Sequence, residues 1–202
     1  MQFEPGDRRR QLPRHLRRPE PEQVFDFRIR PAEASDLPHV REIYNHYVRN
    51  SVVTLDESTS GNRYWRDRLL LVQRLGLPFL VAVSPSEQVI GFALAQPWAG
   101  RNSHRYTAEE SIYLGPGAGG KGLGTALLSA VVEACRERGL RELIAVISDS
   151  GADASIRLHE RLGFVEAGRM GTSGVKYGRS LGTVQMRLAL KPEKRRGLLR
   201  RD

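Results

Sequence analysis

Sulfur ligands are almost missing from this chain of 202 residues, which contains a single cysteine, Cys135. One thiol excludes a disulfide framework and any zinc or iron–sulfur site built on several cysteines. The five histidines show no paired ligand spacing, so we expect no metal. No stretch approaches the ~18 consecutive apolar residues of a membrane-spanning helix. The first 30 residues are rich in Arg and Pro and lack the apolar segment of a secretion signal, so we expect a cytoplasmic protein.

Aromatic residues are also few, at 7%, whereas positive charge is in excess, at a formal +9. The C-terminal stretch 191–202 contains six basic and two acidic residues. Basic tails that bind nucleic acid usually combine charge with aromatic stacking, and no such pattern is present. We therefore expect neither a nucleic-acid nor a membrane partner. The composition predicts a flexible Arg/Pro-rich leader over 1–26, one domain over 27–190 and a basic tail over 191–202.

Apolar periodicity divides the domain into alternating helices and strands. The 3.6-residue period predicts helices over 35–48, 63–75, 125–138 and 152–162, with Ser35 capping the first. Strand patterning predicts an antiparallel hairpin from 79–83 and 89–96 and further strands over 110–114, 143–147, 164–167 and 183–190. The spacing of Cys135 within its helix places that thiol in the core. This order of elements predicts an α+β fold with a mixed sheet.

Glycine is concentrated in one loop, with six glycines between 115 and 124. A glycine-rich turn between a strand and a helix exposes backbone N–H groups, and the helix dipole adds positive potential. Such a loop is typical of a phosphate-binding site. Two ligand classes carry the required phosphates, namely nucleoside triphosphates and coenzyme A.

The nucleotide interpretation depends on the stretch from Gly115 to Lys121, which fits the P-loop pattern G-x-x-x-x-G-K. The next residue should be Ser or Thr to hold Mg²⁺, but it is Gly122. The loop also follows an antiparallel hairpin, whereas a P-loop usually lies near the start of a parallel sheet. An ATP-dependent kinase is therefore the alternative prediction.

The coenzyme A interpretation has wider support, because several segments resemble the GNAT N-acetyltransferases, and most of all their phosphinothricin/methionine sulfoximine acetyltransferase branch. The resemblance covers residues 27–190, and its order and spacing are specific. The segments that carry it are Phe27-Arg-Ile-Arg-Pro31, Ile43-Tyr-Asn-His-Tyr47, Pro97-Trp98 with Arg101-Asn102, Thr107-Ala-Glu109, Ile112-Tyr-Leu114, Gly122-Leu-Gly124 and Ser155-Ile-Arg-Leu-His-Glu-Arg-Leu-Gly-Phe164.

The resemblance implies the three-layer GNAT acyl-CoA N-acyltransferase fold, with a central mixed sheet flanked by helices. It also implies an enzyme that moves an acetyl group from acetyl-CoA to the primary amine of a small, amino-acid-like molecule, by direct transfer in a ternary complex. The resembled enzymes are commonly dimers, which suggests a homodimer. A non-catalytic acyl-CoA-binding module is a second alternative.

For the co-substrate, the resemblance places the coenzyme A pyrophosphate on successive backbone amides of the glycine loop, at Gly119, Gly120, Lys121, Gly122, Leu123, Gly124 and Thr125. The strand Ile112, Tyr113 and Leu114 would pair with the pantetheine arm, and Ser155 would contact the same ligand. The family usually has Gln or Arg at the position of Gly119 and Asn at that of Ala152. Backbone amides should therefore be the main anion ligands here.

For catalysis, the resemblance implies that Glu109 removes a proton from the amine. Glu110 is the rival, and because adjacent strand residues point to opposite faces, only one of them should face the amine. The N–H of Leu114 would polarise the thioester carbonyl. His159 stands where many family members have a Tyr that protonates the leaving thiolate, four residues after Ser155 on one helical face.

For the amine substrate, Arg101 and Asn102 lie on the loop before the catalytic strand, where an Arg can pair with a substrate carboxylate. Trp98 and Tyr106 could form walls of the pocket, and Lys176 matches a recurring Lys in a late Gly-x-Lys-x-Gly stretch. The residues at Ser180, Gly182 and His104 differ from those of phosphinothricin enzymes, so phosphinothricin itself is not carried over as the substrate.

Overall fold

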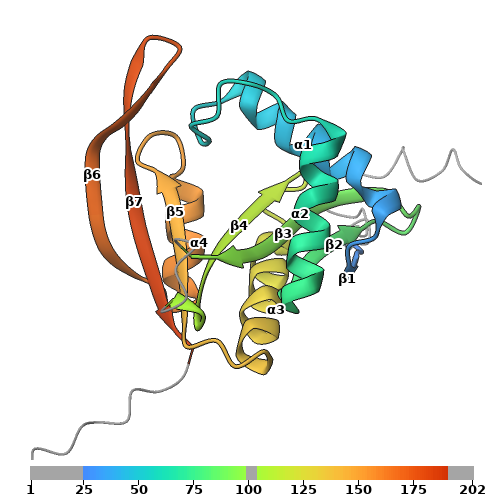
Figure 1. The fold of residues 1–202 in the computed structure, drawn as a ribbon. Helices are drawn as coiled ribbons and strands as arrows, with labels where there is room; N and C mark the ends of the chain where they lie inside the picture. Colours follow the sequence, from blue (N-terminus) through green and yellow to red (C-terminus); the bar gives the residue numbers. More distant parts are fainter. Residues whose placement is uncertain (1–24, 99–103, 191–202) are drawn as a thin grey trace, which may run out of the picture.

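The computed structural model describes residues 25–98 and 104–190, which form a seven-stranded sheet with helices on both faces (Figure 1). The strand order is β1-β2-β3-β4-β5-β7-β6. Only β4 and β5 pair in parallel, and the other neighbours are antiparallel. The predicted α+β class with a mixed sheet is therefore confirmed. The tail 191–202 and all but the last two residues of the predicted leader lie outside the described residues.

The helices agree with the sequence prediction to within two residues at each end. They are α1 (Leu37–Asn50), α2 (Asn62–Leu75), α3 (Leu123–Glu137) and α4 (Asp153–Arg161). No helix in the described part of the chain is long and apolar enough to cross a membrane.

The predicted cap at Ser35 is wrong, because Ser35 lies inside a short 3-10 helix, η3 (Ala34–Asp36), that precedes α1. The Asp36 carboxylate instead accepts a hydrogen bond from the Glu33 N–H at 2.8 Å. It also accepts from both terminal nitrogens of Arg30, at 2.6 and 2.8 Å. The Asp36 side chain thus caps η3 and makes no capping hydrogen bond to α1, and Arg30 of the preceding strand holds its carboxylate.

The strands are β1 (Arg28–Pro31), β2 (Phe79–Val83), β3 (Val89–Pro97), β4 (Thr107–Leu114), β5 (Glu142–Ser148), β6 (Val165–Lys176) and β7 (Arg179–Ala189). β2, β3 and β5 match the predicted strands to within one residue, β4 and β7 begin three and four residues earlier than predicted, and β1 was not predicted. The predicted 79–83/89–96 hairpin is confirmed by the β2–β3 register. β6 is far longer than the predicted strand over 164–167. Its glycines and polar residues hide the alternation, and the long pairing with β7 defines it instead.

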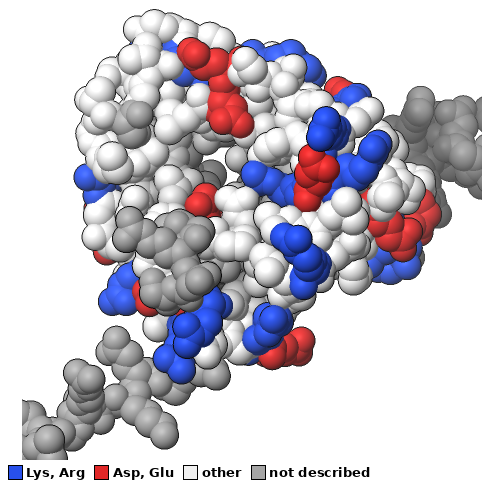
Figure 2. All heavy atoms as spheres, viewed as in Figure 1, with Lys and Arg blue, Asp and Glu red and all other residues white. Residues whose placement is uncertain are grey.

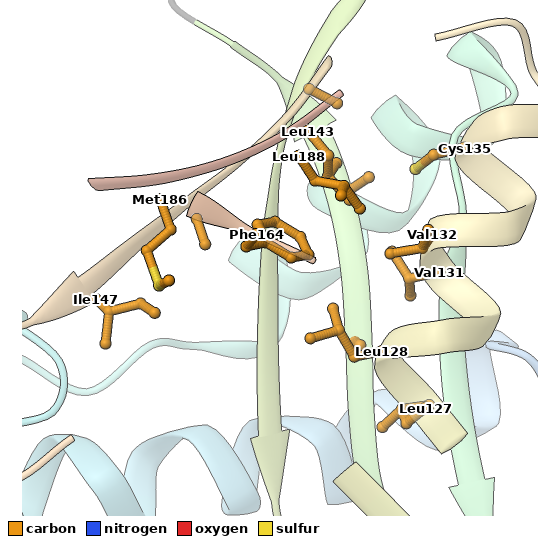
Figure 3. Close-up of a cluster of buried hydrophobic side chains, with 14 of the residues drawn as sticks. Leu127, Leu128, Val131, Val132, Cys135, Leu143, Ile147, Phe164, Met186 and Leu188 are labelled. Atoms are coloured by element: carbon orange, nitrogen blue, oxygen red, sulfur yellow. The ribbon is translucent and has the colours of Figure 1, made fainter. Parts of the chain in front are cut away.

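Side chains on the sheet alternate between two separate cores, and this alternation produces the three layers. Phe92 and Leu94 of β3 belong to the cluster beneath α1 and α2, whereas Ala93 and Ala95 face the cluster beneath α3. Figure 3 shows side chains of the second cluster, including Cys135, between α3 and β5. Cys135 is fully buried, which confirms its predicted place in the core, and burial raises the pKa of its thiol to about 12.

Candidate active site

The site begins where β4 and β5 separate. Their parallel ladder runs from Thr107 opposite Glu142 only as far as Glu110 opposite Ala145. β4 remains paired with β3 up to Leu114 opposite Gly91. The last four residues of β4 therefore have a partner strand on one side and an open edge on the other.

The open edge exposes the backbone of alternate residues. The N–H of Gly115 donates to the carbonyl of Ile90 on the β3 side, at 2.8 Å. Because successive N–H groups point to opposite edges of a strand, those of Leu114 and Ile112 point to the open side. The Leu114 carbonyl on this side accepts a hydrogen bond from the Tyr47 hydroxyl at 2.7 Å. The N–H of Leu114 thus faces the gap, as its predicted role requires.

A cavity of about 770 Å³ lies at this gap. The open part of β4, the glycine loop, the start of α3, the end of β5 and the start of α4 line it. Of the predicted co-substrate residues, the lining includes Ile112, Tyr113, Leu114, Gly119, Gly120, Gly122, Gly124, Thr125 and Ser155. The predicted set is therefore largely brought together in space.

Two residues of the predicted loop differ from the rest. Leu123 is fully buried in the core beneath α3, so its backbone is the part available to a ligand. The ammonium of Lys121 lies 4.6 Å from the ring centroid of Phe25. The Lys121 side chain is exposed and is not part of the lining of the cavity.

The glycines of the loop suit a ligand that approaches the backbone closely. Gly117, Gly120 and Gly122 have φ angles of +75°, +75° and +82°, which L-residues rarely adopt. A Cβ atom at any of the three would have no neighbour within 4 Å. Gly122 is also the N-cap of the 15-residue helix α3, whose dipole adds positive potential at the loop. The loop and cavity are thus suited to hold the diphosphate and arm of coenzyme A.

A second cavity, of about 180 Å³, lies on the other face of β4, beneath α1 and α2. Its charged lining side chains are Asp56, Arg68 and Glu109. Tyr44, Tyr64, Trp65, Leu94, Gln96, Ser111 and Tyr113 complete the lining. Ser111 and Tyr113 also line the large cavity, so the two cavities meet at β4. Figure 2 shows this face hollowed near its centre, with acidic and basic side chains at the margin.

Glu109 and Glu110 face different cavities, because they are adjacent on β4. Glu109 lines the small cavity. Burial raises the pKa of its carboxyl, and this effect exceeds the opposing influence of the Arg68 charge. The carboxylate is thus a better proton acceptor than an exposed glutamate would be.

Glu110 forms a buried pair with His159 of α4. Glu110 Oε1 lies 2.7 Å from His159 Nε2, and both side chains are only 1% exposed. The other ring nitrogen, Nδ1, donates to the Ser155 carbonyl at 2.7 Å, since that oxygen can only accept. Burial alone would lower the pKa of His159, but the hydrogen bond and charge of Glu110 raise it overall.

The two nitrogens of His159 are therefore both occupied, although the residue lies at the wall of the large cavity. The Oε2 atom of Glu110 is buried beside the same cavity and has no hydrogen-bond partner among the described residues. A proton passed from this pair to a ligand would therefore leave from Glu110, whose Oε2 atom is unpaired in the part of the chain that the structure describes. The sequence placed His159 at the site but did not reveal this pairing.

The structure brings the predicted amine-binding residues together less fully than the predicted co-substrate residues. Within the described ranges, the two cavity linings contain none of Trp98, Tyr106 and Lys176. Tyr106 is 39% exposed, with the Arg141 guanidinium 4.5 Å from its ring centroid. Trp98 is half-buried at the end of β3, and its N–H lies 3.4 Å from the Thr107 carbonyl. Arg101 and Asn102 lie outside the described residues.

Lys176 has a supporting position. It is 1% exposed, and its Nζ donates to the Thr54 carbonyl at 2.9 Å. Burial lowers the pKa of this ammonium. Thr54 lies just before Asp56, whose carboxylate accepts a hydrogen bond from Tyr44. Lys176 thus anchors the α1–α2 loop that brings Asp56 to the small cavity.

Sequence reasoning missed the polar residues of α1, α2 and their connecting loop, namely Tyr44, Asp56, Tyr64 and Arg68. Tyr44 lies in a segment that carries the resemblance, but that segment assigns it no role in the site. Arg68 lies one turn after Tyr64, and this i, i+4 pair was the available local signal. No local pattern indicates that Tyr64 and Arg68 line the same cavity as Glu109, which belongs to a strand far along the chain.

The site has three features of an acyl-transfer enzyme. The parallel strands β4 and β5 separate at one end, a glycine loop precedes the N-terminus of α3, and the carboxylate of Glu109 lies on the other face of β4. The sequence model of the acetyltransferase (GNAT) family matches residues 39–164. The chain belongs to this family. The predicted GNAT fold is confirmed, and the kinase interpretation has no support.

The chain is similar to two characterised groups of enzymes in this family. It is 37% identical to a phosphinothricin N-acetyltransferase of Alcaligenes faecalis, over 80% of this chain and 82% of that protein. It is 39% identical to an L-methionine sulfoximine/L-methionine sulfone acetyltransferase of Pseudomonas aeruginosa, over 81% and 95% of the two chains. The crystal structure of a phosphinothricin acetyltransferase from Sinorhizobium meliloti in complex with acetyl-CoA superposes with a TM-score of 0.77, at 40% identity over 81% and 88%.

Proposed function

We propose that this protein transfers the acetyl group of acetyl-CoA to the primary amine of a small, amino-acid-like molecule in a ternary complex. One observation carries the proposal: two cavities of different size and chemistry meet at Ser111 and Tyr113 of β4. The large cavity has the backbone edge and glycine loop that a phosphorylated, extended co-substrate needs. The small cavity has the carboxylate that an amine needs.

The reaction then takes place across β4. The amine nitrogen forms a bond to the thioester carbonyl carbon, and the carbon–sulfur bond breaks with its electron pair going to sulfur. Glu109 accepts the proton that the amine loses. The N–H of Leu114 stabilises the negative charge that develops on the carbonyl oxygen. Holding both reactants beside one strand supplies much of the rate.

The leaving thiolate takes a proton from the Glu110–His159 pair. Because both ring nitrogens of His159 are engaged, we place the transfer at Glu110. The Nε2 proton of protonated His159 passes to Glu110, Glu110 gives a proton to the thiolate, and the pair is left as a carboxylate and a neutral imidazole. A cytoplasmic location and a homodimer stay predictions from the sequence.

The first test is isothermal titration of the purified protein with acetyl-CoA, with Mg-ATP as the matched control. We expect saturable binding of acetyl-CoA and none of Mg-ATP. An assay for released coenzyme A thiol, with L-methionine sulfoximine and a panel of L-amino acids, should then identify acceptors. Binding of Mg-ATP without acetyl-CoA, or tight acetyl-CoA binding without turnover of any amine, would overturn the proposal.

A second prediction concerns the glycine loop. Gly122→Ala forces a Cβ into a left-handed conformation that costs about 1–2 kcal/mol, and relief of this strain moves the backbone amides at the start of α3. We expect acetyl-CoA to bind about 10-fold more weakly, since 1.4 kcal/mol corresponds to that factor.

Gly139→Ala is the matched control, because Gly139 follows the other end of α3, has a similar φ of +83° and no neighbour within 4 Å of a Cβ, and does not line the cavity. Its dissociation constant should stay within about twofold of the parent value, well below the tenfold change that 1.4 kcal/mol produces. Equal weakening in the two variants would show that the backbone at Gly122 has no particular role in acetyl-CoA binding.

A further inference from the structure

We propose that Arg68 recognises the carboxylate of the acceptor, so that the small cavity selects amino acids over amines that lack an acid group. This inference rests on the proposed function and deepens it. It also moves carboxylate recognition from Arg101, on which the sequence prediction depended, to a residue of α2.

The charges of the small cavity match a zwitterion. Among the described residues of its lining, Arg68 is the cation, and Asp56 and Glu109 are the two anions. An α-amino acid carries an ammonium group and a carboxylate a few bonds apart. The volume of about 180 Å³ suits a small molecule of this kind. With the amine at Glu109, Arg68 is the cationic partner that the described part of the lining offers to the carboxylate.

The Arg68 side chain is held in place without using its hydrogen-bond donors. Its guanidinium carbon lies 4.6 Å from the ring centroid of Tyr64 and 5.9 Å from that of Trp65. Within the described part of the chain, no hydrogen bond or ion pair engages its N–H groups. The cation–π contact with Tyr64 thus holds the guanidinium and leaves its N–H groups available for a bidentate contact with a carboxylate.

The neighbouring carboxylates do not use up this charge. Asp56 accepts a hydrogen bond from Tyr44, and no ion pair joins Glu109 to Arg68 within 4.0 Å. The positive charge of Arg68 still lowers the pKa of Glu109, which shows that the two groups share one electrostatic environment. Arg68 therefore both attracts the acid group and helps keep Glu109 ionised.

The position of Arg68 follows from helix geometry. Tyr64 and Arg68 are four residues apart on α2 and so lie on one face, with Trp65 buried beside them. Arg66 projects from the same helix but is exposed and lines neither cavity. This residue is the matched control for the loss of one positive charge from α2.

The test compares each acceptor with its own α-carboxamide, which keeps the amine and removes the acid charge. Steady-state kinetics are measured with L-methionine sulfoximine and a panel of L-amino acids, each beside its amide. The variants are Arg68→Gln, Arg68→Lys and Arg66→Gln. Acetyl-CoA affinity and melting temperature are recorded for each variant to confirm folding.

We expect the parent protein to prefer acids to amides, and Arg68→Gln to raise KM for the acids about 10- to 100-fold with a smaller change in kcat, because a bidentate charged contact is lost. At a pH well above the pKa of Glu109, where the base is ionised with or without Arg68, activity on the amides should change little. Arg68→Lys should restore part of the preference, and Arg66→Gln should retain all of it. Equal losses on acids and amides, or no loss at all, would overturn the inference.

Titration calorimetry of the same acids and amides separates this inference from the proposed function. Acid-selective binding that depends on Arg68, in a protein without acetyl transfer, would support the inference and refute the function. Turnover of amines without any preference for the acid would support the proposed function and refute the inference. Binding of none of the acids would count against the inference.

Discussion

Replacement of Glu109 by Gln is expected to lower kcat/KM for acetyl transfer by about 10²- to 10⁴-fold, the usual contribution of a positioned general base. The amide is nearly isosteric with the carboxylate but cannot accept the proton of the amine. Acetyl-CoA binding should be unchanged, because Glu109 lines the small cavity and the glycine loop lies at the large one. Titration calorimetry and the thiol-release assay measure the two effects separately.

The pH dependence gives an independent check on Glu109. Only the ionised carboxylate can act as a base, and burial raises its pKa above the ordinary range of a glutamate. Activity should therefore fall as the pH decreases through this raised pKa. The Glu109→Gln variant should lack that acid limb in its residual rate.

Glu137→Gln is a suitable control, since Glu137 is exposed at the end of α3. It should match the parent protein in rate and in pH profile. Full activity in Glu109→Gln would instead favour a role for a water molecule or for Glu110, and would contradict the proposed base.

The second large effect concerns the buried pair of Glu110 and His159. Glu110→Ala should lower the free energy of unfolding by about 3–5 kcal/mol, since it leaves a buried imidazole without its partner. Glu110→Gln should lower the free energy of unfolding by less, because its amide can still hydrogen-bond to the neutral ring of His159. Urea denaturation at pH 6 measures both variants.

The surface pair of Glu142 and Arg187 provides the matched comparison. Its atoms are 3.0 Å apart, but the two side chains are 32% and 47% exposed. Glu142→Ala should therefore cost about 0–1 kcal/mol. A similar loss in Glu110→Ala and Glu142→Ala would show that the buried pair is not a special source of stability.

The stability contributed by His159 should also depend on pH in a defined direction. Its pKa in the folded protein is raised above the ordinary value of about 6.5. The contribution is therefore fully present below that value and is lost as the pH rises through the folded pKa. The difference in unfolding free energy between the parent protein and Glu110→Gln should shrink over the same interval. A constant difference up to pH 9 would contradict the charged pair.

Local patterns were enough to predict the helices, the β2–β3 hairpin and the glycine loop. Periodicity and turn chemistry act over a few residues, so they can be read directly from the chain. The alternation of a strand likewise placed Glu109 and Glu110 on opposite faces. The same logic failed for β6, where glycines interrupt the pattern and pairing with β7 supplies the structure.

The sequence by itself thus determined the family, the phosphate-type loop and the short set of candidate groups on β4 and α4. Only the tertiary structure decided which cavity each group faces. The β4–β5 ladder ends early and leaves one edge of β4 open. The fold also buries His159 in contact with Glu110, which is 49 residues away in the chain. It also brings Arg68 of α2 to Glu109. These contacts join distant segments, and their geometry depends on packing that no local spacing records.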